Sequence, residues 1–267
     1  MSETKAEIGI FGGSGFYSLF DSAEEIEVET PYGKPSDKIT IGEIAGHYAA
    51  FLPRHGKDHR FAPHTIPYQA NLWAFKELGV KRIISPSAAG SLQPQIKPGD
   101  FVVCDQFIDK TSGRRSTFYN GPKVMHISCA DPYCNQMRRL AIDSCKNLSI
   151  PVHEKGTVVV IEGPRFTTRA ESHFYQKLDY EVINMTQCPE VALARELEMC
   201  YVNISLITDY DAGLIGMDNV EPVDAKTVVE IFNRNIGRLK ELIHEMIKNL
   251  PAERSCECGS VLSKAEI

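Results

Sequence analysis

The sequence predicts an α/β protein of one domain, in which helices flank both faces of a mixed, twisted central β-sheet. Two observations lead to this fold class. Short runs rich in β-branched residues alternate with amphipathic helical segments along nearly the whole chain. No linker, internal repeat or low-complexity tract divides the 267 residues. We therefore expect one domain over residues 1–250, followed by a tail over residues 251–267 that carries a Cys-Glu-Cys pair.

The composition is that of an ordinary enzyme, with 43% hydrophobic and 24% charged residues. A formal net charge of -6 and the lack of a basic block argue against a nucleic-acid partner. The polar N-terminus has no apolar signal core, and no run approaches the length of a membrane span. We therefore expect a cytoplasmic protein with no membrane partner, which binds small molecules.

In the first half of the chain, each predicted element rests on a local pattern. Apolar alternation indicates strands, Ala45-Gly46 suits a hairpin turn, and Gly79 suits the end of a helix. In order, we expect a strand at 7–11, hairpin strands at 38–43 and 47–52, a donor-rich loop at 54–60, a helix at 68–78, a strand at 82–84 and a small-residue loop at 85–91.

The second half continues the alternation. Thr168 suits a helix N-cap, Pro189 suits the start of a helix, and Asp224 suits the first turn of the last helix. In order, we expect a strand at 100–107, a long loop at 110–125, a helix at 131–147, a strand at 156–161, a helix from 169, a strand at 182–183, a helix at 189–197, a strand at 202–207, a helix at 223–249 and a tail without periodicity.

The stretch Thr208-Asp209-Tyr210-Asp211 follows the predicted strand at 202–207. If the backbone stays extended there, Asp209 and Asp211 point to the same side and share one pocket. Repulsion between two close carboxylates, together with burial, raises the pKa of one of them, so that a neutral donor lies beside an anionic acceptor. Such a pair suits the edge of a heterocycle that carries a ring nitrogen next to an amine. The alternatives are a solvated turn and a pair that holds magnesium.

Other polar groups also follow predicted strands. Ser14, within Gly-Gly-Ser-Gly, belongs either to a phosphate-binding turn or to a plain tight turn. Arg54 and His55 begin a basic loop, and Arg54 could hold a phosphate through two parallel hydrogen bonds, although a solvated basic loop is the alternative. Ligands of such sheets bind at strand ends. We therefore expect these groups, Ser87 with Ala88, and Met185 with Thr186 to lie on the same rim as the two aspartates.

The eight cysteines are more than a cytoplasmic enzyme is expected to contain. Six are scattered, and scattered free cysteines usually behave as small buried hydrophobes. Only Cys256 and Cys258 form a pair, and because a zinc site is expected to need a second pair, with no matching histidine pair present, the spacing disfavours structural zinc. We assign no metal ligands. Disulfides remain an alternative that would suit a protein from a hot environment.

Seven motifs in order resemble the methylthioadenosine phosphorylase branch of the purine nucleoside phosphorylase family, from Ile8 through the last helix. They are Gly-Gly-Ser-Gly at 12–15, Pro-Arg-His-Gly at 53–56, Tyr-Gln-Ala-Asn at 68–71, Glu-Gly-Pro-Arg-Phe at 162–166, Ile-Asn-Met-Thr at 183–186, Pro-Glu-Val at 189–191 and Thr-Asp-Tyr-Asp at 208–211. The resemblance implies the nucleoside phosphorylase fold. It also implies cleavage of a purine nucleoside by inorganic phosphate, which is a co-substrate, with no cofactor.

The resemblance also implies roles for individual residues. Asp209 would protonate or hydrogen-bond purine N7, and Asp211 would accept from the 6-amino group, with Tyr210 between them as a base-site spacer. Phe166 would stack on the base, and Met185 would pack on the ribose. The phosphate site that the resemblance implies consists of Ser14, Arg54, His55, Ser87, Ala88 and Thr186.

Substrate preference and assembly also follow from the resemblance. The specificity positions are Thr167, Val223, Thr227 and His126 of a neighbouring subunit. Because Thr227 stands where a leucine would be more apolar, we expect adenosine to be a substrate as well. A shared site implies a homo-oligomer, either a trimer or a hexamer built as a dimer of trimers. A thermophilic hexamer would favour disulfides between Cys134 and Cys200 and between Cys256 and Cys258.

Three other activities provide alternatives to this one. The first is a purine nucleoside phosphorylase for inosine and guanosine, in which the resemblance implies asparagine where Asp209 stands. The second is a nucleoside hydrolase, which would need a carboxylate that activates water. The third is a non-catalytic purine sensor, which would have no use for a phosphate site.

Overall fold

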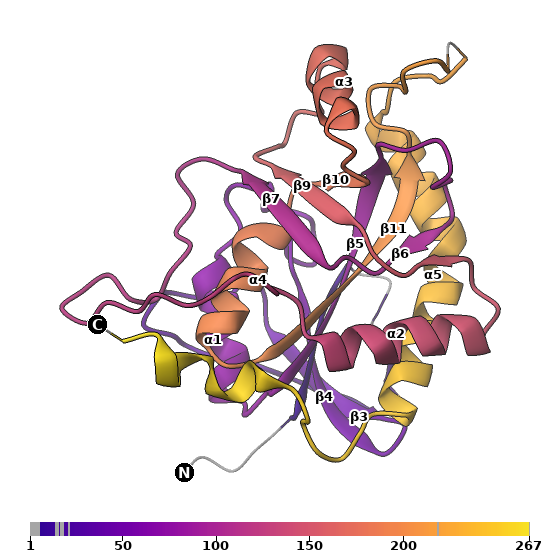
Figure 1. Ribbon diagram of the computed structural model, residues 1–267. Helices are drawn as coiled ribbons and strands as arrows, with labels where there is room; N and C mark the ends of the chain where they lie inside the picture. The colour runs from indigo at the N-terminus through magenta and orange to yellow at the C-terminus, as the bar shows by residue number, and fades with distance from the viewer. Residues whose placement is uncertain (1–5, 14–15, 17–18, 21, 218, 267) are drawn as a thin grey trace.

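The computed structural model describes residues 6–13, 16, 19–20, 22–217 and 219–266. Within these residues, an eleven-stranded mixed sheet is flanked by helices on two faces, as the sequence predicts (Figure 1). The main path of the sheet runs β2-β3-β4-β1-β5-β10-β9-β7, while β11 pairs with β5 and β6, and β6 pairs with β8. No helix among the described residues is long and apolar enough to cross a membrane.

The first half of the chain folds mostly as predicted. The antiparallel pairing of β3 with β4 confirms the predicted hairpin, and the buried β1 lies parallel to both β4 and β5. The elements are β1 (Ile8–Gly12), β2 (Ala23–Ile26), β3 (Ile39–Ile44), β4 (His47–Pro53), α1 (Tyr68–Glu77) and β5 (Arg82–Ser91).

The predicted loop at 85–91 is wrong, because these residues continue strand β5. They pair in parallel with β11 (Cys200–Asp209), from Ser85 opposite Asn203 to Ala89 opposite Ile207. Serine is common in turns because its hydroxyl can hydrogen-bond to the nearby backbone. In β5 the hydroxyls of Ser85 and Ser87 instead hydrogen-bond to buried side chains of other elements. Ser85 donates to Glu190, and Ser87 accepts from Asn203.

The predicted strand at 100–107 is divided in two. β6 (Phe101–Val102) runs antiparallel to β11 and parallel to β8 (Val152–His153), whereas β7 (Gln106–Lys110) pairs with β9 (Thr157–Ile161). The intervening residues carry the chain from one set of partners to the other. The apolar pattern indicates burial but does not show this change of partner.

The second half contains the remaining helices. Thr168 caps α3 in a complete capping box, and Asp224 is the N-cap of α5 rather than a residue of its first turn. The elements are α2 (Asn135–Asn147), α3 (Arg169–Lys177), β10 (Val182–Asn184), α4 (Gln187–Glu196) and α5 (Ala225–Lys248).

Alternating side chains of the strands divide the core between two faces of the sheet. Leu72 of α1 and Val191 of α4 belong to one buried cluster, while Met137 of α2 and Leu239 of α5 belong to another (Figure 1). On β1, Ile10 packs in the α2–α5 cluster and the adjacent Phe11 in the α1–α4 cluster. This period of two is expected of a strand buried on both faces.

The tail is more ordered than its lack of periodicity predicts, because residues 257–264 form a 3-10 helix, η2 (Glu257–Lys264). The side chain of Arg82 donates to the Pro251 carbonyl at 2.8 Å, and the Ala265 carbonyl accepts from the His126 backbone N–H at 2.7 Å. The tail therefore packs against both the main domain and the long loop before α2.

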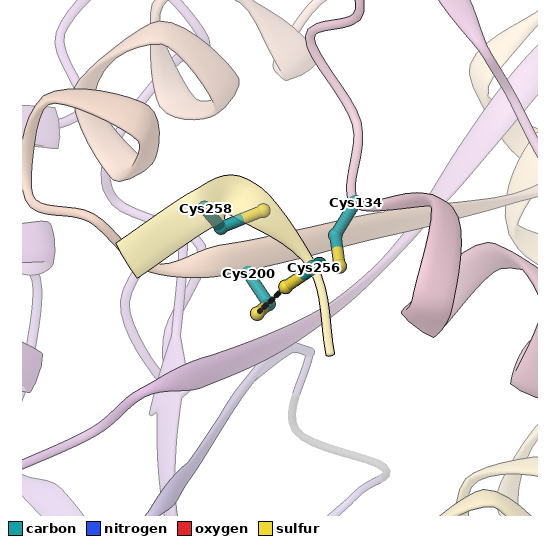
Figure 2. Close-up of side chains that lie close together, drawn as sticks. All are labelled: Cys134, Cys200, Cys256 and Cys258. Atoms are coloured by element: carbon teal, nitrogen blue, oxygen red, sulfur yellow. Dashed lines mark hydrogen bonds between the residues drawn. The ribbon is translucent and has the colours of Figure 1, made fainter. Parts of the chain in front are cut away.

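All eight cysteines lie among the described residues, and all are free thiols. The expected disulfides, Cys134 with Cys200 and Cys256 with Cys258, are therefore not formed in this structure. These four cysteines instead lie in one cluster (Figure 2). Tertiary contacts therefore bring two cysteines that are isolated in the sequence, Cys134 and Cys200, to the Cys256 and Cys258 pair.

Candidate active site

A cavity of about 500 Å³ opens where several strands end beside α5. Strands β1, β4, β5 and β11 run parallel through the sheet, and their neighbour β10 runs antiparallel to β5. The cavity is lined by Gly12, Gly13, Arg54, His55, Gly56, Lys57, His59, Pro63, Pro86, Ser87, Ala88, Ala89, Gly90, Ile161, Phe166, Ile183, Asn184, Met185, Thr186, Thr208, Asp209, Asp211, Val228, Val229, Phe232, Asn233 and Ile236.

Asp209 and Asp211 both line this cavity, although not for the predicted reason. Asp209 is the last residue of β11, but Asp211 adopts a left-handed conformation with a φ of 50°, so the backbone is not extended. The turn lets the Asp211 N–H donate to Asp209 Oδ1 at 2.8 Å. A Cβ at Gly90 would lie only 2.7 Å from the same oxygen, so the glycine makes room for this carboxyl group.

The protonation of both carboxyl groups is shifted in the same direction. Burial raises the pKa of Asp209, although hydrogen bonds from the Thr208 hydroxyl and the Asp211 N–H oppose the shift. Burial also raises the pKa of Asp211, against a hydrogen bond from the Thr167 hydroxyl. The cavity therefore favours a neutral carboxyl group, which can donate a proton to a ligand.

Arg54, which directly follows β4, also lines the cavity, where it is buried and held as a cation. Its Nε donates to Glu190 Oε1 at 2.7 Å, and its Nη2 donates to Glu190 Oε2 and to Ser85. Burial would lower the pKa of Arg54, but the Glu190 carboxylate outweighs this effect and the pKa is raised. A further bond from Nη1 to the Pro86 carbonyl leaves one of the five N–H groups without an acceptor among the described residues. The predicted double grip on a phosphate is therefore wrong for this conformation.

His55 faces the cavity as a neutral imidazole. Burial lowers its pKa to about 4, although its hydrogen bond with the Phe61 carbonyl opposes the shift. Nδ1 lies 2.8 Å from that carbonyl oxygen, which can only accept, so Nδ1 carries the proton. Nε2 is therefore an acceptor, and the structure resolves a tautomer that the sequence leaves open.

Ser87 and Asn184 meet on the wall between Arg54 and the aspartates. Ser87 Oγ accepts from the amides of Asn184 and Asn203 at 3.2 and 3.1 Å. With both lone pairs occupied, the hydroxyl can only donate further. Asn184 Oδ1 is buried and has no hydrogen-bond partner among the described residues. The wall therefore offers a ligand one directed donor and one acceptor.

Apolar side chains form the rest of the lining. Met185 fits because Gly163, with a φ of 65°, has no Cβ, which would lie 2.6 Å from the Met185 sulfur. Phe166 faces the cavity from the loop before α3, and Val228 and Phe232 face it from α5. The cavity thus combines a cation and hydroxyl groups with two carboxyl groups at the end of β11 and apolar side chains of α5.

The sequence model of the phosphorylase superfamily matches residues 7–248 of this chain. The chain belongs to the phosphorylase superfamily. S-methyl-5'-thioadenosine phosphorylase of Pyrococcus furiosus is 53% identical over 96% of this chain and 97% of that protein. Purine nucleoside phosphorylase of Streptomyces coelicolor is 45% identical over 98% of this chain and 96% of that protein.

Solved structures of the superfamily share the fold of this chain. One is a variant of adenosine/methylthioadenosine phosphorylase from Schistosoma mansoni in complex with methylthioadenosine. It is 37% identical, covers 94% of this chain and 93% of its own, and superimposes with a TM-score of 0.86. The predicted nucleoside phosphorylase fold and enzyme class are confirmed.

Several residues that the sequence predicts for the site lie away from the cavity lining of this protein. Val223 donates its N–H to the Asp211 carbonyl, and Thr227 donates its hydroxyl to the N-cap Asp224. Tyr210 lies half-buried in the turn after β11, and the exposed His126 lies in the loop before α2. Ser14 lies outside the described residues. The α5 side chains that do line the cavity begin one position after Thr227.

The sequence interpretation missed two residues of the site. Glu190 fixes Arg54 in the wall, and Asn184 adds a buried acceptor. Both belong to the quoted motifs Pro-Glu-Val and Ile-Asn-Met-Thr, so the motifs indicated the segments. Their roles depend on side chains far apart in the sequence, which no local pattern shows.

Proposed function

We propose that this enzyme cleaves S-methyl-5'-thioadenosine with inorganic phosphate, giving adenine and 5-methylthioribose 1-phosphate, as a step of purine salvage. One observation carries the proposal: two carboxyl groups whose pKa is raised by burial line one cavity together with the Arg54 cation and the Ser87 hydroxyl. The names of the archaeal relative and of the ligand-bound Schistosoma structure support the substrate. Inorganic phosphate is a co-substrate in this proposal, and no cofactor is required.

The phosphate is proposed to bind along the wall that contains Arg54. The remaining Arg54 N–H and the Ser87 hydroxyl would donate to its oxygens, and His55 Nε2 would accept a proton from a protonated phosphate oxygen. Ser14, the Ala88 backbone and Thr186 complete the proposed set. Held under C1′, the phosphate attacks as the sugar gains oxocarbenium character, so positioning supplies much of the rate.

The leaving adenine is proposed to bind at the end of β11. Asp209, whose pKa is raised by burial, donates a proton toward N7 as negative charge builds on the purine. Asp211, oriented by Thr167, accepts from the 6-amino group in its ionised form. Phe166 stacks on the base, and Met185 packs on the ribose. Tyr210 acts as a spacer that sets the turn between the two aspartates.

The 5′ group is proposed to lie against the apolar side of α5. Val228 and Phe232 provide this surface, with Val223 and Thr227 at its edge and His126 contributed by a neighbouring subunit. A thioether gains from apolar contacts, whereas a 5′-hydroxyl needs a partner. We expect adenosine to be a second, slower substrate for this reason.

A site completed by His126 of a neighbour requires a homo-oligomer, either a trimer or a dimer of trimers. The loop over residues 110–125, which leads to the exposed His126, is proposed to form part of the interface. We further propose that residues 1–250 form the catalytic domain, that residues 251–267 form a tail, and that the enzyme works in the cytoplasm.

The test compares methylthioadenosine, adenosine and inosine, each with and without phosphate, and identifies the released base. We expect phosphate-dependent release of adenine, fastest from methylthioadenosine. Release without phosphate would exclude phosphorolysis.

Inosine cleavage is the second candidate, because the Streptomyces coelicolor relative carries the name purine nucleoside phosphorylase. The ionised carboxylate of Asp211 can only accept a hydrogen bond, and so can the oxygen of a 6-oxo base. Both groups would be left without a donor, and such unpaired buried groups discriminate strongly against a substrate. Rapid release of hypoxanthine, with little adenine, would favour this candidate instead.

A further inference from the structure

A cluster of four cysteines lies at the start of β11 (Figure 2). Three separate segments contribute to it: Cys134 is the N-cap of α2, Cys200 is the first residue of β11, and Cys256 and Cys258 lie where the tail enters η2. All four Sγ atoms lie within 4.8 Å of one another. Cys256 is partly buried, and the other three are buried.

The spacing of the sulfur atoms suits a tetrahedral metal ion. Zinc–sulfur bonds of about 2.3 Å place the ligand sulfurs about 3.8 Å apart in a tetrahedron. Cys200 and Cys256 Sγ lie 3.3 Å apart, which is longer than the roughly 2.05 Å of a disulfide. Disulfides would join sulfurs in pairs, whereas this cluster gathers four around one point.

We propose that Cys134, Cys200, Cys256 and Cys258 bind one Zn²⁺ ion as a structural tetrathiolate site. Four protein ligands leave no open position for a substrate, so the site would not act in catalysis. It also lies at the opposite end of the ten-residue strand β11 from Asp209, roughly 30 Å away. The proposal is therefore independent of the proposed phosphorolysis.

The surroundings can accommodate the negative charge of such a site. Binding releases four thiol protons, so Zn²⁺ with four thiolates carries a net charge of two minus. Cys134 lies at the positive end of α2, whose first turn contains no acidic residue. The guanidinium of Arg254 lies beside Gly259, one position after Cys258.

The site would fasten the tail to the rest of the domain. Cys256 and Cys258 belong to the tail, while Cys134 and Cys200 belong to α2 and β11. Farther along, the tail forms a β-bridge between Glu266 and Met125. Metal binding would thus hold the tail in place and, through it, the loop next to His126.

The test measures metal content by mass spectrometry after expression with added zinc and purification under reducing conditions, without a polyhistidine tag. We expect one zinc per chain in the wild type. The double variant Cys256→Ser, Cys258→Ser should retain less than roughly a tenth of it. The double variant Cys145→Ser, Cys188→Ser removes two other buried thiols and should keep its zinc.

A second measurement uses only the wild type, in case a variant fails to fold. Protein loaded with Co²⁺ should show the charge-transfer and ligand-field absorption of a tetrahedral cobalt thiolate. Zinc removal by a chelator should make four thiols reactive and speed proteolysis of the tail. A zinc-free wild type, two disulfides in the unreduced protein, or zinc retained by the first double variant would each overturn the proposal.

Discussion

The two ends of strand β11 differ in how their functional groups come together. At the C-terminal end, Asp209 and Asp211 are neighbours in the sequence, and one turn directs both into the cavity. At the N-terminal end, Cys200 meets three cysteines from α2 and the tail. The first arrangement is local and the second is long-range. A motif therefore reveals the first, whereas only the folded chain reveals the second.

The two ends also differ in their effect on stability. The cavity holds Asp209, Asp211 and His55 in surroundings that disfavour their charged forms, which opposes folding at pH values where these groups are charged in the unfolded chain. Zinc bound to the proposed four-cysteine site stabilises the fold through the free energy of metal binding. We expect substitutions at the two ends to separate activity from stability.

The largest expected effect is on activity, from Asp209→Asn. Loss of the proton donor should lower kcat/KM for methylthioadenosine by on the order of 10²–10⁴, because general acid catalysis typically contributes that much. Turnover of 6-oxopurine nucleosides should rise relative to adenine nucleosides. Steady-state kinetics with both substrate classes measures the change.

The exposed Asp143→Asn on α2 is the matched control and should keep wild-type kinetics. Zinc content and melting temperature should remain close to wild type in both variants. Undiminished adenine preference in Asp209→Asn would show that the base contact is assigned to the wrong residue.

The next effect is on stability, from Glu190→Gln. Glu190 is fully buried and accepts from both Arg54 in the cavity wall and Tyr201, the residue after Cys200. Removing one charge of a buried pair typically costs about 3–5 kcal/mol, because the other charge is left uncompensated. Urea unfolding of the variant measures the loss.

The surface pair between Lys146 and Glu154 provides the comparison, since both side chains are more than half exposed. Glu154→Gln should change the free energy of unfolding by less than about 1 kcal/mol. Equal losses in the two variants would mean that the Arg54–Glu190 pair is not held in a buried, low-dielectric site.

The smallest effect depends on pH and comes from His55. Its pKa of about 4 in the folded protein lies below its ordinary 6.5, so between these values only the unfolded chain binds the proton. The contribution of His55 to stability should therefore fall by up to about 3 kcal/mol as the pH drops from 6.5 to 4. Unfolding free energies measured across this range test it.

His55→Asn keeps a donor for the Phe61 carbonyl but cannot titrate, so its stability should depend less on pH across the same interval. The difference between the two proteins at pH 8, where the imidazole is neutral in both states, serves as the reference. Parallel curves for the two proteins would show that His55 is not buried as described.

Much of the fold and part of the site follow from local patterns. The hairpin around Ala45 and Gly46, the Thr168 cap and the strand before Asp209 were predicted from alternation, capping residues and turn residues. These signals depend on residues close in the sequence. The segments that line the cavity were predicted for the same reason, since polar groups after strands meet at one edge of the sheet.

The sequence by itself determined the alternation of strands and helices, the paired carboxyl groups and the polar loops around them. Only the tertiary structure decided that β5 continues through a small-residue run, that Glu190 holds Arg54, and that four cysteines share one site. Each of these depends on contacts between residues far apart in the chain. Periodicity reports which face of an element is buried, but not which distant side chain it meets there.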